Sequence, residues 1–503
     1  MDSRPIVFAK IEYNKEYARY PPYGIFTLGS LLKQNGHNVK LYQNMKEDVK
    51  ECARQIVEDD PVFLGMSILT SAGSKINLDL CKEVKRLNPE ITIVWGGIHP
   101  SMDPAQCLRA DAVDMVVVGE GEETILNLAN EMVNSRDFEN VNNLQFKTPS
   151  GIVKTPVNFM DKNPLEMFTL DWSLIDVEKY AFYKELNGNT YTSFYYFFSY
   201  GCPHNCTFCY FQNENINKKW RTWPIEVALN DIKFLRDDYG VEVIDFLDGN
   251  FILGRQRILR FTEGLKELGI KWTSSARIDY MTKEYAEMLR DNGCLRLGFG
   301  IESLNDRMLQ KMEKGYTKKQ VFDGVRAMAQ VPEIKAICSY IIGLPTETEE
   351  ESKETIESII ELEKIHPDIS AGIGIYIPLP GVPLAEDAIK GGFKPPETIE
   401  ETEIFNRWDI KMEMPWVTWG DTKKLHNIGY YLGLHQNLKG SVFDIPIKWC
   451  LKNRIFPPVE KIPTPIKKLL LKRYKRHDRV LTNMPFDKTR KKEKMPIVVE
   501  NEC

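Results

Sequence analysis

Three cysteines with C-x3-C-x2-C spacing are the part of the chain best suited to do chemistry. Cys202, Cys206 and Cys209 follow directly after an aromatic run, Tyr191 to Tyr200. Three thiolates on one short loop can hold three irons of a cubic iron–sulfur cluster and leave the fourth iron without a protein ligand. That iron can bind and reduce a small molecule. The alternative is a structural zinc site, which needs four ligands, with His204 as the nominal fourth.

Polar residues recur where predicted strands end in the middle of the chain. Between residues 191 and 383 the sequence alternates six predicted strands with helices; the strands are Tyr191–Phe198, Glu242–Leu247, Lys271–Ser275, Leu295–Gly300, Ala336–Ile342 and Ile373–Tyr376. Such βα units close into a partial barrel whose active groups lie at the carboxyl ends of the strands. Those ends carry acids, amides, hydroxyls and one arginine.

The first 150 residues predict a second α/β unit. Short apolar strands alternate with helices, as in a doubly wound parallel sheet, whose ligands lie beyond the carboxyl ends of the strands. Three predicted strands end in residues that allow close backbone approach or offer polar groups: Ser67, Ile68 and Thr70; Gly96, Gly97 and His99; and Gly119, Glu120, Gly121 and Glu122. By themselves these loops also suit a flavodoxin-like or nucleotide-binding domain.

The cysteine loop resembles that of radical S-adenosylmethionine (SAM) enzymes. Pro22-Tyr23-Gly24, Gly96-Gly97-x-His99-Pro100 and Gly119-Glu120-Gly121-Glu122, in that order, look like the cobalamin-binding domain found ahead of some radical SAM cores. The resemblance implies a [4Fe–4S] cluster on the three cysteines. Its open iron would chelate the amino and carboxylate groups of SAM, and reduction would cleave SAM to a 5′-deoxyadenosyl radical.

The resemblance also assigns SAM-binding roles at the strand ends. SAM needs acceptors for its amino group, a cation for its carboxylate and polar groups for its ribose; the residues offered are Asp248, Asn250, Ser275, Arg277 and Glu302, with Phe208, Ile341 and Gly343 near adenine. The acid of the fifth strand end, Glu347, falls one residue later than the family's usual spacing. In the alternative interpretation, Arg277 pairs with Asp279, Glu302 caps a turn, and the Gly343 segment is only a strand-to-helix turn.

Cobalamin is the third cofactor that the resemblance implies. Its expected contacts are Tyr23 and Gly24, together with the ten residues of the three loops named above. The D-x-H-x-x-G signature that supplies a lower-axial histidine in many cobalamin proteins is absent. The resemblance therefore implies cobalamin bound with its own base displaced and no histidine below cobalt, and a loop-packing role for His99 is favoured over ligation.

Length and composition place these motifs in several domains. A chain of 503 residues is too long for one core. We expect a cobalamin-binding Rossmann-like domain at 1–140, a linker at 141–190, a partial (β/α)6 radical SAM barrel at 191–385 and a mainly helical, substrate-shaping region at 386–503. No apolar run approaches the roughly 20 residues that span a bilayer, and the other cysteines are scattered singly. We expect a cytoplasmic, oxygen-sensitive protein.

The C-terminal region is basic although the whole chain is acidic. Residues 441–503 hold 16 Lys and Arg against 7 Asp and Glu, a charge of +9, whereas the net charge of the chain is −5. Pro465 to Arg473 interleaves apolar and basic residues, and Lys488 to Lys494 resembles a disordered basic tail. This region suits peripheral contact with an anionic membrane, or an amphipathic helix packed on the barrel. No specific nucleic-acid signal is present.

These features together predict a cobalamin-dependent radical SAM methyltransferase that methylates an unactivated carbon. It would take methyl from methylcobalamin, use an external one-electron reductant of the flavodoxin or ferredoxin type, and act on a small-molecule or lipid-like substrate. A cobalamin-dependent cyclase or ring-modifying oxidoreductase without methyl transfer is the second interpretation. A non-catalytic corrinoid-binding protein is the third, although it leaves the cysteine loop unexplained.

Overall fold

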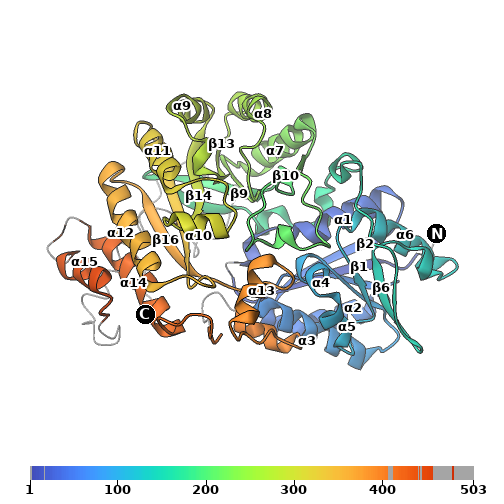
Figure 1. The fold of residues 1–503 in the computed structure, drawn as a ribbon. Coiled ribbons are helices and arrows are strands. Elements are labelled where there is room, and N and C mark those ends of the chain that lie inside the picture. Colours follow the sequence, from blue (N-terminus) through green and yellow to red (C-terminus); the bar gives the residue numbers. More distant parts are fainter. Residues whose placement is uncertain are drawn as a thin grey trace.

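The protein contains two parallel sheets that lie side by side, joined by short linking segments (Figure 1). The computed structural model describes residues 3–15, 17–405, 412–439, 441, 444–456 and 479–480. Two segments on which expectations were stated lie outside the described residues: Pro465–Arg473, expected to be basic and amphipathic, and Lys488–Lys494, expected to be a disordered basic tail.

The N-terminal sheet has seven strands in the order β2-β1-β3-β4-β5-β6-β7. Strands β1 to β5 are parallel, and β6 and β7 form an antiparallel hairpin at one edge. The strands are Ile6–Glu12, Val39–Met45, Leu64–Ser67, Ile93–Gly96, Met115–Val117, Leu144–Thr148 and Gly151–Lys154, and helices α1 to α6 are Tyr23–Gln34, Val49–Glu58, Ala72–Leu87, Ile98–Met102, Pro104–Arg109 and Glu122–Val133. The doubly wound fold is confirmed. The sheet extends through the hairpin, past the expected boundary at residue 140.

The second sheet curls into a half-barrel with the order β16-β15-β14-β13-β12-β9-β8-β17. Its six parallel strands are β9 (Asn189–Tyr196), β12 (Val243–Phe246), β13 (Lys271–Ala276), β14 (Cys294–Glu302), β15 (Lys335–Ile342) and β16 (Ser370–Ile375); β8 (Phe182–Leu186) and β17 (Arg479–Val480) add an antiparallel edge. Helices α7 (Ile225–Tyr239), α8 (Arg255–Glu267), α9 (Lys283–Asp291), α10 (Asp306–Lys311), α11 (Lys318–Ala329) and α12 (Glu349–Ile365) follow the strands. Most of them line the convex side, which confirms the partial (β/α)6 barrel (Figure 1).

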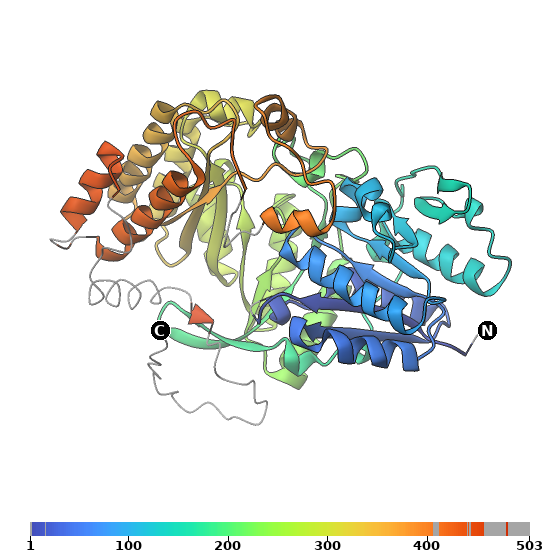
Figure 2. The same ribbon diagram turned by 90° about the horizontal axis from the view of Figure 1, so that it is seen from below.

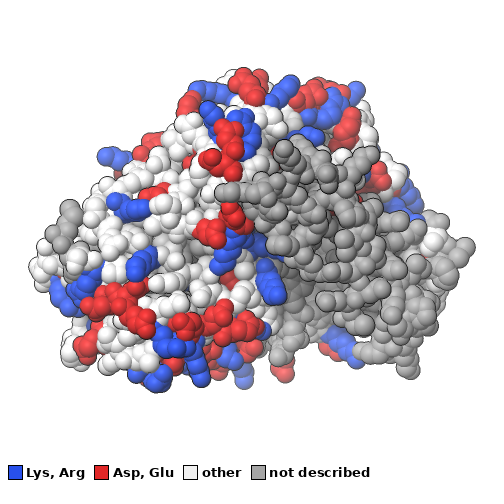
Figure 3. All heavy atoms as spheres, turned by 180° about the vertical axis from the view of Figure 1, so that it is seen from behind, with Lys and Arg blue, Asp and Glu red and all other residues white. Residues whose placement is uncertain are grey.

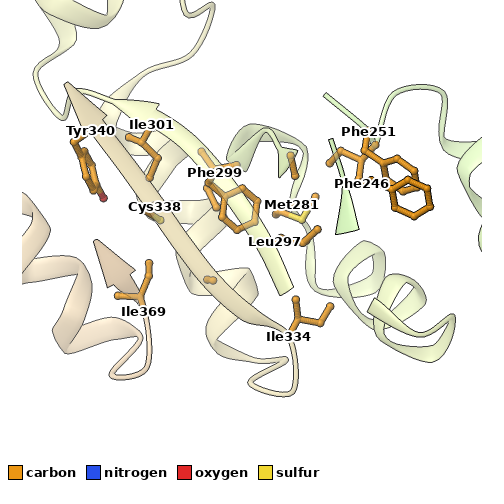
Figure 4. Packing of buried hydrophobic residues seen from close by; sticks show 14 of the residues in the cluster. Phe246, Phe251, Met281, Leu297, Phe299, Ile301, Ile334, Cys338, Tyr340 and Ile369 are labelled. Carbon is orange, nitrogen blue, oxygen red and sulfur yellow. The ribbon is translucent and has the colours of Figure 1, made fainter. Parts of the chain in front are cut away.

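Alternation along the strands decides which face each side chain occupies. In β14, Leu297, Phe299 and Ile301 are buried against the helices, and Cys338 and Tyr340 of β15 join them (Figure 4). The intervening residues face the concave side. These include glycines in β14 and β16, which add no side chain to the concave face.

The C-terminal region packs along both sheets. After α13 (Pro383–Lys390), the chain crosses to the N-terminal domain, where Ile399 enters its core just before the 3₁₀ helix Glu400–Phe405. It then returns to the barrel as α14 (Thr422–Leu438) and α15 (Asp444–Asn453), which lie at the end of the half-barrel away from the N-terminal domain (Figure 2).

One buried histidine joins these last helices to the barrel. His435 of α14 lies with its Nε2 2.7 Å from Glu363 of α12 and its Nδ1 2.5 Å from Asp444 of α15. Burial by itself lowers the pKa of His435, but the two carboxylates outweigh burial and raise the pKa above its usual value. The histidine therefore joins three helices through its contacts with two buried carboxylates.

Charged residues of both signs are interspersed on the face that Figure 3 shows, among the atoms drawn there as described. The described helices include none that is long and apolar enough to cross a membrane.

Candidate functional site

The three cysteines lie on a loop whose base is closed by a short antiparallel pair. Strand β10 (Ser199–Tyr200) pairs with β11 (Arg221–Thr222), and the cysteine loop is the chain between them. Gly201 has a φ of +79°, and a Cβ there would lie 2.3 Å from the carbonyl oxygen of Lys219, so only glycine fits. The cysteine loop is therefore held in place at its base by the β10–β11 pair and by the close backbone contact at Gly201.

The exposure of the thiols separates these cysteines from the rest. Cys202, Cys206 and Cys209 are half-buried, whereas the other six described cysteines are buried. Burial raises the pKa of Cys202, and it raises that of Cys209 to about 11, with neighbouring thiols adding to the effect on both. A metal bound here would displace protons from these thiols, because the thiolate is the ligand.

His204, the nominal fourth ligand of a zinc site, is engaged by another residue. Among the described residues, no three His, Cys, Asp or Glu side chains converge on one point as ligands of a single ion do. Thiolates around a cubane each bind a different iron and stand farther apart. His204, the nominal zinc ligand, has its Nε2 2.9 Å from the hydroxyl of Tyr280. Burial, helped by Arg277, lowers the pKa of His204 to about 4, so the ring is neutral.

Of the two polar residues after β12, one supports the loop and the other lacks a partner. Asp248 accepts hydrogen bonds from the backbone N–H of Phe198 (3.0 Å) and the hydroxyl of Ser199, directly before the cysteine loop. Burial raises the pKa of Asp248 to about 6. Asn250 is buried with neither its amide nitrogen nor its oxygen hydrogen-bonded in the structure. Since buried polar groups are nearly always paired, Asn250 has polar atoms available to a ligand, whereas the carboxylate of Asp248 is already engaged.

A lysine that the sequence did not single out connects several of the expected SAM residues. The ammonium of Lys314 lies 3.7 Å from Glu302, donates to the carbonyl of Gly300 (2.7 Å) and stands 5.7 Å from the centre of the Phe208 ring. Arg277 donates to the carbonyl of Lys314. Nothing in the sequence pattern marks this lysine, because it lies in the connection after α10 and not at a strand end.

Arg277 and Glu302 differ in how they are held. Arg277 pairs with Asp279 at 3.0 Å, as the alternative interpretation expected, yet its side chain is buried and not on the surface. Glu302 has a φ of +70° at a register shift between β14 and β15, and burial raises its pKa against the effect of Lys314. A non-glycine residue held in this conformation is typical of a functional site. Ser275 is exposed at the end of β13.

At the fifth strand end, Ile341 is half-buried and faces the concave side. Gly343 follows with a φ of +73°. The carboxylate of Glu347 accepts from the backbone N–H groups of Gly343 (2.7 Å) and Leu344 (3.3 Å), and burial raises its pKa to about 8. Glu347, the acid that falls one residue later than the family's usual spacing, therefore binds the backbone of its own turn.

In the N-terminal domain, the segments that carry Gly24, Ser67 and Gly97 pack closely because two of these residues are glycines. A Cβ on Gly24 would lie 2.5 Å from the hydroxyl of Ser67, and one on Gly97 would lie 2.8 Å from the same oxygen. Gly97 also has a φ of +97°. Gly96, Ile68 and Ser67 lie at the paired ends of β3 and β4. The strand ends are thus packed closely, and small residues leave the backbone accessible to a ligand.

His99 lies inside the domain. It is fully buried, its Nδ1 is 3.0 Å from the hydroxyl of Thr70, and its Nε2 is buried without a hydrogen-bond partner in the structure. Burial lowers its pKa. His99 is thus held through Thr70 on one side of its ring, and the loop-packing role stays a prediction.

The third loop of the N-terminal domain, residues 119–122, contacts the half-barrel directly. Glu120 forms a buried ion pair with Arg221 of β11, and its other oxygen accepts from Asn217 at 3.2 Å. Next to it, a Cβ on Gly119 would lie 3.0 Å from the carbonyl oxygen of Asn215. Gly121 precedes α6, and burial raises the pKa of Glu122 to about 7. Residues 215 to 221 follow the cysteines in the chain. The segment that carries the cysteines therefore contacts the third loop of the N-terminal domain directly.

Tyr23 also joins the two domains. Its hydroxyl donates to the carbonyl of Tyr195 (2.7 Å), and its ring packs edge-on against Phe197 at 4.8 Å. Tyr23 and Glu120, both expected at cobalamin, therefore have interdomain contacts of their own in this structure.

Apolar surface remains exposed at both strand edges. Leu69, just after β3, is 49% exposed, and Tyr200, just before the cysteines, is 40% exposed. Each of these side chains lies beside a strand end where a ligand can reach it. The donor set of these edges fits cobalamin on the N-terminal domain and a cluster with SAM on the half-barrel.

Comparison with known proteins agrees with this arrangement. The radical SAM superfamily model matches residues 196–359, and the B12 binding domain model matches residues 14–129. An uncharacterized methyltransferase of Pyrococcus horikoshii is 30% identical over 374 residues, which cover 73% of this chain and 78% of the relative. The anaerobic magnesium-protoporphyrin IX monomethyl ester cyclase of Rubrivivax gelatinosus is 28% identical over 72% of this chain and 65% of the relative.

Solved structures share the fold at lower identity. The radical SAM methyltransferase TsrM from Kitasatospora setae, solved with cobalamin and a [4Fe–4S] cluster, has a TM-score of 0.63 at 17% identity, over 78% of this chain and 76% of its own. The cobalamin-dependent SAM radical enzyme OxsB, solved with aqua-cobalamin and SAM, has a TM-score of 0.63 at 20% identity, over 93% of this chain and 70% of its own.

Proposed function

Because the chain belongs to the cobalamin-binding branch of the radical SAM superfamily, we propose that it methylates an unactivated carbon of a small-molecule substrate. Its cofactors are a [4Fe–4S] cluster, SAM and cobalamin. When bound, the cluster and SAM supply a 5′-deoxyadenosyl radical, and cobalamin supplies the methyl group.

The observation that carries the proposal is the shared contact between the cysteine loop and the third loop of the N-terminal domain. The Glu120–Arg221 ion pair and the hydrogen bond from Asn215 to the carbonyl of Ser101 (3.0 Å) join the two strand edges. A substrate between these edges can meet the radical source on one side and the methyl donor on the other. Holding reactants in this way is what such a protein contributes.

Each group of side chains has a positional task. The three cysteines hold the cluster and leave one iron open for SAM. Asn250, whose amide has no partner, and Arg277 are placed to orient the polar groups of SAM, and Glu302 with Lys314 is placed beside them. The interdomain contacts of Tyr23 and Glu120 hold the two edges at a fixed distance.

Isotope transfer tests the proposal. Anaerobically reconstituted enzyme is incubated with reductant, a candidate substrate and SAM carrying a deuterated methyl group. We expect the product to gain one intact deuterated methyl group and 5′-deoxyadenosine to form with it. A product that lacks the label while 5′-deoxyadenosine still forms would contradict methyl transfer.

A cyclase is the second candidate, because three of the more similar relatives are anaerobic magnesium-protoporphyrin IX monomethyl ester cyclases. In the same experiment a cyclase gives 5′-deoxyadenosine and a product with one new ring bond but no label. A non-catalytic corrinoid carrier forms no 5′-deoxyadenosine under any of these conditions.

The partners follow from the same chemistry. An enzyme of this type acts on a small molecule and needs a one-electron reductant, for which we propose a flavodoxin or ferredoxin. The basic sequence after residue 456 supports a lipid-like substrate and peripheral contact with an anionic membrane. Co-sedimentation of the full chain with anionic but not zwitterionic vesicles is the expected result, and equal recovery with both would contradict it.

A further inference from the structure

The turn after β15, residues 343–347, contains two residues with positive φ angles, and its last residue hydrogen-bonds to its first. Gly343 and Thr346 have φ angles of +73° and +67°, and the carboxylate of Glu347 binds the N–H groups of Gly343 and Leu344. Such a turn needs support from its surroundings to persist. Ile341 and Gly343 are the residues expected beside the adenine of SAM, so the shape of this turn bears on the site.

Two tryptophans of the C-terminal region hold the turn by its carbonyls. The indole N–H of Trp416 donates to the carbonyl of Gly343 at 2.8 Å, and that of Trp419 donates to the carbonyl of Glu347 at 2.8 Å. These are the first and last residues of the turn. Trp416 is buried, so its hydrogen bond is shielded from water.

The same region fills the outer side of the turn. A Cβ on Gly343 would lie 2.8 Å from the end carbons of both Met414 and Leu425. The C-terminal region therefore leaves no room for a ligand on that side. Only the side that continues the concave face through Ile341 is open to SAM.

The segment that carries the tryptophans is also fastened to the N-terminal domain. Trp416 packs edge-on against Phe393 at 5.4 Å, and beyond Phe393 the chain places Ile399 in the N-terminal core. Arg109 donates to the carbonyl of Glu397 at 2.8 Å. The turn is thus linked through one stretch of chain to the domain expected to hold cobalamin.

We propose that Trp416 and Trp419 are positioning residues for SAM: by fixing the two ends of the 343–347 turn they hold its backbone in the conformation that binds adenine. The inference rests on the proposed function, because it takes the turn to be part of the SAM site. It adds to the site a C-terminal element that no strand-end motif predicts.

The test compares variants that lack the indole hydrogen bonds at the turn with a variant that lacks an indole hydrogen bond elsewhere in the protein. Trp416→Phe, Trp419→Phe and the double variant remove the two donors but keep an aromatic ring. Trp172→Phe is the matched control, because the Trp172 indole also donates a hydrogen bond, to Asp231 at 2.9 Å on the convex side of the barrel. Trp449→Phe, at an exposed position, controls for the substitution itself.

SAM affinity is measured by equilibrium dialysis of the reconstituted holoenzyme, with iron content, cobalamin content and thermal midpoint recorded in parallel. Two hydrogen bonds of ordinary net strength correspond to roughly a tenfold or larger change in an equilibrium. We expect the double variant to bind SAM about tenfold more weakly than Trp172→Phe at equal iron and cobalamin content. It should also form 5′-deoxyadenosine in excess over product. Equal SAM affinity in these two variants would overturn the inference.

A second measurement on the unaltered protein guards against variants that fail to fold. Hydrogen exchange with and without SAM should show protection of the 343–347 segment together with residues 414–419. Protection of the turn alone would overturn the inference and leave the proposed function standing. A wild-type holoenzyme that does not bind SAM would instead refute the proposed function.

Discussion

The buried ion pair between Glu120 and Arg221 allows a quantitative test of how the two domains are joined. Its side chains are only 9% and 4% exposed, and they connect the third loop of the N-terminal domain to the strand that closes the cysteine loop. The perturbation is Arg221→Met, which removes the guanidinium but keeps apolar volume. Glu120 is then left as a buried carboxylate with hydrogen bonds only from Asn217 (3.2 Å) and the N–H of Met160 (3.3 Å).

The magnitude follows from this uncompensated charge. Removing one partner of a buried ion pair costs about 3–5 kcal/mol of stability, whereas replacing the pair with neutral groups of similar volume is often nearly neutral. The two remaining donors to Glu120 place Arg221→Met near the lower end, at about 3 kcal/mol. Adding Glu120→Gln removes the charge, so the double variant should recover most of that loss. Glu120→Gln alone leaves the buried guanidinium without a counter-charge and should cost a similar amount, about 3 kcal/mol, so the coupling energy of the cycle is at least about 3 kcal/mol.

Urea unfolding followed by tryptophan fluorescence gives the stabilities, and cobalamin retained after gel filtration reports the site. Arg260→Met is the control, because Arg260 and Glu226 form an exposed pair worth under about 1 kcal/mol. We expect Arg221→Met to lose cobalamin and the double variant to retain more of it. A loss of stability no larger than that of Arg260→Met, or effects that simply add, would refute the reasoning.

Three further outcomes are expected. Cys206→Ala should reduce iron and sulfide after anaerobic reconstitution to background while the far-ultraviolet circular dichroism is unchanged; a full cluster in this variant would contradict the assignment. Gly24→Ala should cost about 1–3 kcal/mol in urea unfolding by overpacking against Ser67, and Ser67→Gly should restore part of it; an unaltered midpoint would contradict the close contact. The pKa of His435 is raised on folding, so the stability that its charged form adds to the protein is complete below the ordinary pKa of 6.5 and is lost as pH rises through the folded value. His435→Gln should therefore flatten the fall of the urea midpoint above neutral pH. An unchanged slope of midpoint against pH would contradict this.

The fold could be predicted because its signals are local. Each parallel strand is a short apolar run bounded by turn residues and followed by an amphipathic helix, and right-handed βα units arrange such elements in few ways. Boundaries were less certain where pairing decides them. Strand β2 continues to Met45 because it pairs with β1 as far as Glu12. The helix begins at Val49.

The site could be predicted only as far as strand ends define it. A motif tells which end of a strand a residue occupies, but not whether the side chain points to the ligand or to the protein. Asp248 and Asn250 are two residues apart, yet one anchors the cysteine loop and the other is left without a partner. Lys314 was missed for a related reason, since its neighbours Phe208 and Glu302 are brought together only by folding.

The interdomain contacts lie beyond any local signal because each joins distant parts of the chain. Glu120 meets Arg221, Tyr23 meets Tyr195, and Trp416 meets Gly343. A partner so far away in sequence cannot be inferred from spacing, and an acid or aromatic at a strand end looks the same whether it binds a cofactor or a second domain.

These contacts also explain why residues at the strand ends need not all touch a cofactor. Two parallel sheets each offer a ligand edge, but chemistry that requires both edges depends on the distance between them being fixed. Tyr23 and Glu120 fix it from the N-terminal domain, and Arg221 does so from the strand that closes the cysteine loop. The stretch that places Ile399 in the N-terminal core also carries Phe393, whose contact with Trp416 adds a third connection. Residues that set the spacing therefore control the reaction as strictly as those that hold a ligand, since a radical and a methyl donor that are displaced by an ångström no longer share one substrate.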